Sequence, residues 1–241
     1  MKLLFLLLAT LPLLAQKNMK PEMTELWEPV PNSVNPGNLS APPSDAIVLF
    51  DGTDLSQWIN VTNGEPAHWI INSDGSMTVK QKGGIETKEE FGSIQLHIEW
   101  KTPVVVNGKG QGRGNSGVFF QKSYEIQVLD SYDNVTYSNG QAASVYKQSA
   151  PLVNASKLPG EWQTYDIIFN EPHYDKKGNR LKKGSFTVFH NGVLVQNNVQ
   201  IQGTTEYIGY PKLRDIKIPK RLHLQDHGNP VSYRNIWLRK L

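Results

Sequence analysis

Short apolar segments, separated by turns rich in glycine, asparagine and aspartate, recur along the chain from Ile47 to the C-terminus. The clearest is 91–102, where apolar residues occupy every second position from Ile94 to Trp100 and polar residues stand between them. Alternation of this kind puts apolar side chains on one face of a half-buried strand. Because no segment keeps a helical period, we expect an all-β fold, a two-sheet antiparallel β-sandwich.

Turn signals divide this part of the chain into its expected strands. Ser73-Asp74-Gly75 is typical of the tight turn of a β-hairpin and lies between strands expected at 68–72 and 76–80. A single helical turn is expected at 53–57. Further strands are expected at 47–50, 91–102, 162–170, 185–190, 193–195, 221–226 and 232–239, with two more around a tight connection in 115–130.

Residues 1–15 have the pattern of a secretory signal. Lys2 precedes the apolar run 3–14, and Ala15 follows as a cleavage position. The run is shorter than the roughly 20 residues that a membrane-spanning helix needs. We therefore expect an exported protein, periplasmic or secreted, with no transmembrane segment after cleavage; the alternative is an N-terminal anchor that stays on the protein.

Residues 16–45 form a proline-rich segment before the domain proper. They cannot be a regular helix or a central strand, because proline removes a backbone donor and fixes φ. A disordered tether is one interpretation, but Trp27, Val30 and Val34 favour an extended arm that wraps onto the domain. The domain itself is expected to span 46–241. The prolines are Pro21, Pro29, Pro31, Pro36, Pro42 and Pro43.

The chain contains no cysteine. Disulfides, thiolate metal sites, a cysteine nucleophile and lipoprotein attachment are therefore excluded, which suits a bacterial exported protein held together by its core. The formal net charge of +3 is too weak to indicate a nucleic-acid partner or an acidic membrane surface. Basic residues are scattered, apart from Lys176-Lys177 and Lys182-Lys183, which flank Gly178-Asn179 and predict an exposed loop.

Polar side chains occupy alternate positions on three of the expected strands. Glu125 and Gln127 share one face of their strand, while Ile126 and Val128 point to the other. An acid beside an amide on an otherwise apolar strand fits an open, sugar-sized polar surface; the alternative is the solvated face of a half-buried sheet. If the polar faces coincide, one concave surface would gather the pairs His97/Glu99, Glu125/Gln127 and Gln225/His227.

Other segments suggest further sites. The glycine-rich loop 107–114 lacks the spacing and the following helix of a phosphate-binding motif, and we interpret it as a flexible loop that places Arg113 over a binding face. His223, Gln225 and His227 share a strand face, so a two-histidine metal site is an alternative to a polar, sugar-facing ladder. The better candidates for stacking on sugars are the loop tyrosines Tyr132, Tyr137 and Tyr146.

Together these motifs resemble a known family. The segments that carry the resemblance are Ile47-Val-Leu-Phe-Asp-Gly-Thr-Asp-Leu-Ser-Gln-Trp58, Gly114-Asn-Ser-Gly-Val-Phe-Phe-Gln121, Tyr124-Glu-Ile-Gln-Val-Leu-Asp-Ser131, Gly160-Glu-Trp-Gln-Thr-Tyr-Asp166, Phe189-His-Asn-Gly-Val193 and 224–237. Over nearly all of residues 25–241 the chain is similar to the exported bacterial proteins called 3-keto-disaccharide hydrolase domains. The resemblance implies a concanavalin A-like (laminin-G-like) jelly roll and action on sugars whose C3 hydroxyl has been oxidised to a ketone.

The chemistry implied by the resemblance needs a base near C2, an acid near the leaving oxygen and donors to the developing enolate. On the matched motifs and on strand parity, we predict Glu125 as the general base or acid and His227 as its partner. Asn115 and Asp226 have an alternative role in holding turns. The predicted substrate-binding residues are His97, Glu99, Arg113, Asn115, Gln127, Tyr146 and Gln225.

The favoured function is a glycosidase-like hydrolase of 3-keto-glycosides or 3-keto-disaccharides, with a carbohydrate substrate and no cofactor. A lyase or hydratase of the same pathway is an alternative, and so is a non-catalytic carbohydrate-binding module, because one fold hosts both enzymes and binders. A third interpretation is a calcium-dependent structural domain. Its oxygen ligands would come from Asp130, Asp133 and Asp226, which also leaves a structural calcium ion open.

Overall fold

The computed structural model describes residues 19–38, 41–80, 83–213 and 220–241. The chain divides into two compact units, Met1–Asn35 and Pro36–Leu241. In the first unit the described residues form one short 3-10 helix, η1 (Pro21–Thr24), within extended chain. The expected signal segment 1–15 lies outside the described residues, and docking of the proline-rich arm stays a prediction. No helix in the described part of the chain is long and apolar enough to cross a membrane.

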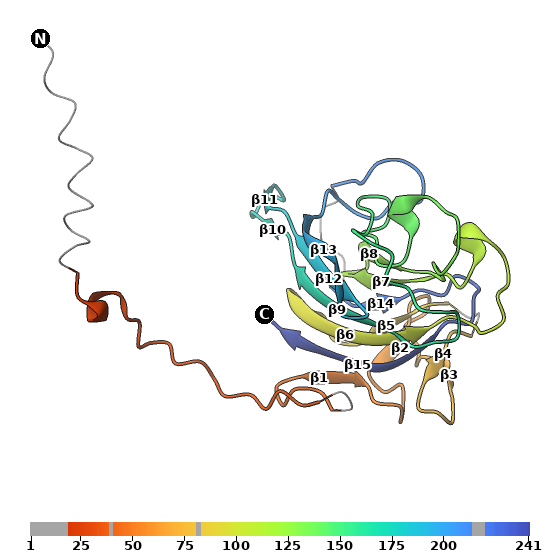
Figure 1. Ribbon diagram of the computed structural model, residues 1–241, viewed down its shortest axis with the longest axis horizontal. Helices are drawn as coiled ribbons and strands as arrows, with labels where there is room; N and C mark the ends of the chain where they lie inside the picture. The colour runs from red at the N-terminus through yellow and green to blue at the C-terminus, as the bar shows by residue number, and fades with distance from the viewer. Residues whose placement is uncertain (1–18, 39–40, 81–82, 214–219) are drawn as a thin grey trace, which may run out of the picture. The chain divides into compact units, whose positions relative to one another are not determined.

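The second unit is a sandwich of two antiparallel sheets (Figure 1), which confirms the predicted all-β fold. The larger, 8-stranded sheet contains, in spatial order, β13 (Val193–Gln200), β12 (Ser185–His190), β9 (Gln163–Asn170), β6 (Ile94–Lys101), β15 (Ser232–Lys240), β4 (Met77–Thr78) and β3 (Ile70–Ile71), and β1 (Ile47–Phe50) pairs with β15. The smaller, 5-stranded sheet contains β2 (Trp58–Asn60), β5 (Ile85–Thr87), β14 (His223–Leu224), β7 (Ser116–Phe120) and β8 (Tyr124–Val128). A separate hairpin is formed by β10 (His173–Tyr174) and β11 (Arg180–Lys182).

The alternating strand β6 shows how the pattern builds the core. It lies between β9 and β15, and its apolar residues from Ile94 to Trp100 are buried while the polar residues between them are only half-buried. In the smaller sheet Ile126 belongs to the same core, so Glu125 and Gln127 point to the opposite, outer face of β8. Strand parity therefore places the acid and the amide as predicted.

Two tyrosines of the larger sheet cross the core and hydrogen-bond to the smaller sheet. The Tyr165 hydroxyl on β9 donates to the backbone carbonyl of Gln127, 2.8 Å away. The Tyr233 hydroxyl on β15 donates to Ser116 Oγ at 2.6 Å, and Ser116 Oγ donates in turn to the carbonyl of Gln225 at 2.6 Å. Both contacts lie on the core side of the strands whose outer face carries polar residues.

Several expected elements are shorter than predicted or absent. The helical turn expected at 53–57 does not form; the chain there makes a turn in which the Trp58 N–H donates to the carbonyl of Leu55 at 2.9 Å. The strand expected at 221–226 pairs regularly only in β14, because the following residues turn away at Gly228, whose φ is 78°. The other 3-10 helices, η2 (Gly110–Gly112) and η3 (Ser138–Gly140), lie in loops around β7 and β8.

Candidate active site

The outer face of the smaller sheet forms the floor of a pocket of about 280 Å³. This volume lies just below the usual range of ligand pockets, about 300–1,000 Å³, and suits one or two sugar rings better than a long chain. Strands supply Glu125, Gln127 and Phe119, and loops close the sides. The complete lining is Asn115, Phe119, Glu125, Gln127, Tyr146, Thr205, Tyr207, Gln225 and His227.

Glu125 is the buried acid of this pocket, with only 4% of its surface exposed. Burial removes water from the carboxylate and raises the pKa of Glu125 to about 8. No ion pair formed by the described residues involves this side chain. At neutral pH the carboxyl is therefore mostly protonated, yet its pKa lies close enough to 7 for it to exchange a proton in either direction.

Gly117 leaves the space that the Glu125 carboxyl occupies. It lies on β7 opposite Gln127. A Cβ atom at position 117 would stand 2.7 Å from Glu125 Oε1 and 2.8 Å from Phe119 Cε2, closer than real Cβ contacts come. The glycine is thus required by close approach of two pocket side chains.

Gln127 lies beside the acid and is almost fully buried. One of the two orientations of its amide places the NH2 group 3.0 Å from Glu125 Oε1 and 3.0 Å from the carbonyl of Ser116. In that orientation the amide donates to the carboxyl group and fixes its plane. Gln127 also contacts the side chain of Gln111, 2.9 Å away, which comes from the loop before β7.

Loops on the free edge of β8 form the walls of the pocket. The N–H of Tyr146 donates to the carbonyl of Glu125 at 3.1 Å, and the N–H of Glu125 donates to Thr205 Oγ1 at 3.0 Å. The hydroxyls of Tyr146 and Tyr137 are 2.6 Å apart. Lys147 lies 4.7 Å from the ring centre of Tyr207 and donates to its carbonyl. These contacts bury the carboxyl and leave Tyr207 and His227 exposed at the rim.

The structure brings most of the predicted site residues to this pocket. Glu125 and Gln127 form its floor, and His227 lies at its exposed rim. The side-chain Nδ2 of Asn115 donates to the carbonyl of Gln111 at 2.7 Å, so part of its function is to hold the preceding loop, as the alternative prediction had it. The predicted residues that line the pocket are Asn115, Glu125, Gln127, Tyr146, Gln225 and His227.

Arg113 does not line the pocket. Its Nε donates to Asp130 Oδ2 at 2.7 Å, and its other nitrogens donate to the carbonyls of Tyr132 and Asp133 at 2.8 and 3.2 Å. The guanidinium therefore holds the loop that follows β8 rather than extending over a binding face. The expectation that it hangs over the site does not match this geometry.

His97 and Glu99 lie on the outer face of the larger sheet, so they do not share a surface with Glu125. His97 Nδ1 is 2.7 Å from Asp166 Oδ1, and Arg234 Nε donates to Glu99 Oε2 at 2.6 Å. Burial opposes charge on His97, but bonds and charges from Asp166 and Glu99 raise its pKa to about 9. Burial likewise disfavours the charged form of Glu99, but its hydrogen bonds lower its pKa to about 2.

Three lining residues were not predicted from the sequence: Phe119, Thr205 and Tyr207. Phe119 pairs directly with Glu125 across the β7–β8 hairpin. Placing the hairpin turn between 120 and 124 in the sequence would have set this register and identified Phe119. Thr205 and Tyr207 come from a loop some 80 positions away from Glu125, and no local pattern in the sequence links them to the site.

The metal sites considered as alternatives are not assembled by the described residues. In the described part of the chain, no three His, Cys, Asp or Glu side chains lie close enough together to hold a metal ion. His223 stacks on Phe119 with ring centres 5.1 Å apart, and burial lowers its pKa to about 4. Asp130 binds Arg113, and Asp226 accepts from the N–H groups of Gly83 and Gly228 at 3.1 and 2.8 Å.

Comparisons with known proteins bear on the family and the fold of this chain. The profile of a family described as the 3-keto-alpha-glucoside-1,2-lyase-like domain matches residues 45–239. A crystal structure of a candidate glycosyl hydrolase from Parabacteroides distasonis is 49% identical and covers 92% of this chain and 97% of its own, with a TM-score of 0.88. A second candidate glycosyl hydrolase from that organism, 21% identical over 82% of this chain and 94% of its own, shares the fold with a TM-score of 0.59. No curated protein matched the chain.

Proposed function

The chain belongs to the 3-keto-alpha-glucoside-1,2-lyase-like family, and on that premise we propose that it cleaves glycosides whose C3 hydroxyl has been oxidised to a ketone. The observation that carries the proposal is a single buried carboxyl, Glu125, on the floor of a sugar-sized pocket. Its pKa of about 8 makes the ionised form a stronger base than an ordinary carboxylate.

The proposed reaction begins with proton transfer from C2 to the Glu125 carboxylate. The C3 ketone accepts the electron pair as an enolate, which then re-forms the ketone, makes a C1–C2 double bond and breaks the bond from C1 to the glycosidic oxygen. His227, at the rim, donates a proton to that leaving oxygen. Addition of water across the C1–C2 bond, with OH to C1 and H to C2, would complete a net hydrolysis.

The remaining lining residues supply binding and charge stabilisation in this proposal. The amides of Gln225 and Asn115 are the donors available to the enolate oxygen and to sugar hydroxyls, while the Gln127 amide holds the Glu125 carboxyl. The rings of Phe119 and Tyr207 offer apolar surface on which a sugar ring can stack.

The pocket supports keto activation better than ordinary glycoside hydrolysis. Among the described residues that line it, Glu125 is the only carboxylate. Most glycosidases of unmodified sugars need two carboxyl groups, about 5–9.5 Å apart, to protonate the leaving group and attack C1. A ketone at C3 removes that requirement because it acidifies the C2 proton, so one base and one weaker acid suffice.

The experiment supplies p-nitrophenyl 3-keto-α-glucoside and its unoxidised parent to the protein and measures nitrophenol release. We expect release from the keto substrate alone. Glu125→Gln should lower kcat by about 10²–10⁴-fold, as expected for loss of a general base, and leave substrate binding within a few-fold. Glu65→Gln, at an exposed position, is the matched control and should not change the rate.

Three outcomes would contradict the proposal. Equal rates on both substrates would remove the role of the ketone. Full activity of Glu125→Gln would remove the proposed base. Tight binding of sugars with no turnover would favour the binding module. The ultraviolet absorbance of the enone separates the steps, because an enone that forms and then decays to the 3-keto sugar indicates addition of water, whereas an accumulating enone indicates elimination alone.

A further inference from the structure

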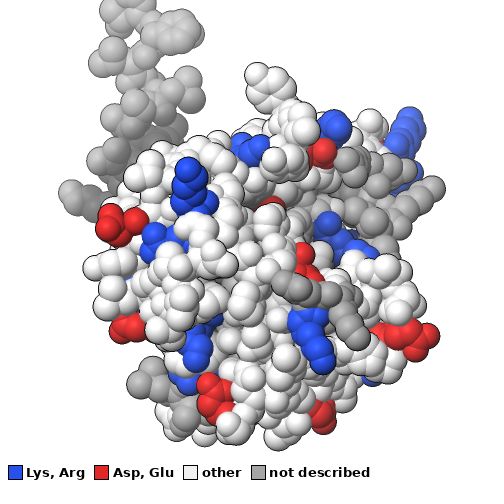
Figure 2. Space-filling model, turned by 90° about the vertical axis from the view of Figure 1, so that its right-hand side faces the viewer, with Lys and Arg blue, Asp and Glu red and all other residues white. Residues whose placement is uncertain are grey.

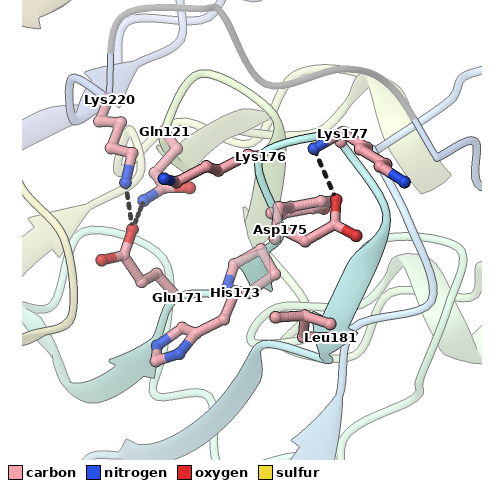
Figure 3. A pocket seen from close by; sticks show the side chains of 11 residues that line it. Gln121, Glu171, His173, Asp175, Lys176, Lys177, Leu181 and Lys220 are labelled. Atoms are coloured by element: carbon pink, nitrogen blue, oxygen red, sulfur yellow. Dashed lines mark hydrogen bonds and ion pairs between the residues drawn. The ribbon is translucent and has the colours of Figure 1, made fainter.

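A second, larger hollow of about 740 Å³ lies beside the β10–β11 hairpin and shares no lining residue with the Glu125 pocket (Figure 3). Its walls come from the turn between β7 and β8, the chain around β10, and Lys220, three residues before β14. The residues used below are Gln121, Glu171, Lys176, Lys177 and Lys220, all of which line it.

The wall of this hollow carries a buried amide acceptor without a partner. Gln121 is only 3% exposed, and its Nε2 donates to Glu171 Oε2 at 2.9 Å. Lys220 Nζ donates to the same oxygen at 2.6 Å, which fixes the carboxylate and, through it, the amide. The Oε1 atom of Gln121 is buried and accepts no hydrogen bond from the described residues. An acceptor left open by the described residues is one that a donor group of a bound molecule can satisfy.

The turn between β7 and β8 sets the positions of Gln121 and Lys122. Gln121 and Lys122 have φ angles of 51° and 54°, a region that residues other than glycine, asparagine and aspartate rarely adopt. Gln121 and Lys122 are the two central residues of a tight hairpin turn, closed by the Ser123 N–H donating to the carbonyl of Phe120 at 3.0 Å, and a type I′ turn requires positive φ at both positions. The side chain of Gln121 reaches Glu171 in the hollow, and that of Lys122 reaches Glu86 with Nζ 2.6 Å from Oε2.

The hairpin beside this hollow carries a cluster of basic residues, and the lining itself holds three lysines against the two carboxylates of Glu171 and Asp175. Residues 173–183 contain five Lys or Arg and one Asp, a formal charge of +4, while the whole chain carries +3; the other residues therefore sum to −1. Arg180 and Lys183 are bound to carbonyl and amide oxygens of Ile201 and Gln202. Lys176 extends from the hairpin toward Gln121 in Figure 3, and among the described residues no carboxylate pairs with its ammonium group.

We propose that this hollow is a second saccharide-binding site, which takes an anionic segment of a glycan. A sugar hydroxyl donates to Gln121 Oε1, and Glu171 and Lys220 bind its neighbouring hydroxyls. A carboxylate or sulfate group on the same or the next sugar meets Lys176 and Lys177 at the rim. The site holds a glycan without cleaving it, and it acts independently of the function proposed for Glu125.

The test measures binding of a tetragalacturonate, a sulfated heparin tetrasaccharide and neutral maltotetraose to the full chain by calorimetry. We expect the charged sugars to bind and maltotetraose to bind at least tenfold more weakly, and the two charged probes distinguish carboxylate from sulfate. Lys176→Glu/Lys177→Glu should weaken binding tenfold or more. Lys80→Glu/Lys109→Glu, exposed positions that do not line the hollow, makes the same change of charge and should have no effect.

Gln121→Leu tests the amide and should weaken binding several-fold without changing its salt dependence. All of these variants should keep full turnover of 3-keto-glycosides, so failure of the two proposals can be told apart. Unchanged binding by the Lys176→Glu/Lys177→Glu variant would overturn the inference. So would loss of binding in Glu125→Gln, equally tight binding of single-stranded DNA, or no binding of either charged sugar.

Discussion

At the scale of single residues, the pKa of the Glu125 carboxyl is determined by the groups that cover it. Desolvation is the one cause that raises its pKa to about 8. Loops tied to β8 through Tyr146 and Thr205 remove water, and Gly117 leaves room for the group without a charged partner. The same burial that makes Glu125 a stronger base makes its ionisation costly to the fold.

That cost predicts a pH dependence of stability. In the unfolded chain the carboxyl ionises near 4.5, and in the folded protein near 8. Between these values the folded state binds one more proton, so the free energy of unfolding falls as pH rises, by up to about 1.4 kcal/mol per pH unit. Urea unfolding of the wild type and Glu125→Gln from pH 5 to 9 measures the difference. The variant should become more stable relative to the wild type as pH rises. If the free energies of unfolding of the two proteins change in parallel with pH, Glu125 has an ordinary pKa.

At the scale of elements, the β7–β8 hairpin carries both the floor of the pocket and the space for its acid. Gly117→Ala should keep the fold, because a strand accepts alanine, but the new methyl group would push Glu125 Oε1 and Phe119 from their places. We expect kcat/KM on the 3-keto substrate to fall at least tenfold. Gly112→Ala is the control, since nothing lies within 4 Å of its Cβ and its rate should not change. Equal effects of the two substitutions would rule out the steric argument.

Strand β6 carries a different polar group, whose role we expect to be structural. His97 is bonded to Asp166 and stacks on Trp237 with ring centres 5.1 Å apart. Its raised pKa contributes stability that is full below about 6.5 and is lost as pH rises through about 9. His97→Gln should lower the free energy of unfolding by about 1–3 kcal/mol at pH 7. The loss of stability should become smaller above pH 9, and kcat/KM should not change. A large loss of activity at unchanged stability would indicate instead that His97 binds the substrate.

At the scale of the whole molecule, hydrogen bonds through the core join the two sheets beneath the pocket. The charged residues are spread over most of the surface. On the face drawn in Figure 2, Lys and Arg are interspersed with Asp and Glu on a largely uncharged background. This agrees with the scattered basic residues of the sequence and contrasts with the charge gathered in 173–183. Tyr165 and Tyr233 reach from the larger sheet to the backs of the strands that carry the site.

The cross-sheet bonds predict a measurable coupling between the layers. Tyr165→Phe removes the donor to the Gln127 carbonyl inside the core and should lower the free energy of unfolding by about 1–2 kcal/mol in urea. Tyr233→Phe removes the bond to Ser116 and should cost about as much. Tyr210→Phe, with Tyr210 91% exposed, is the control and should be neutral. Neutral effects of both core substitutions would mean that packing alone joins the sheets.

The sequence by itself determined the all-β class and the side of each strand that a residue faces, because side chains alternate in any strand whatever its neighbours are. Glu125 and Gln127 therefore lie opposite Ile126, as their parity required. Tertiary structure alone decided which strands share a sheet, since pairing joins residues far apart in the chain. It placed His97 and Glu99 on the other layer, bound Arg113 to Asp130, and brought Thr205 and Tyr207 over the acid. The pKa of Glu125 was decided there too, because it depends on water excluded by loops that no local pattern connects to it.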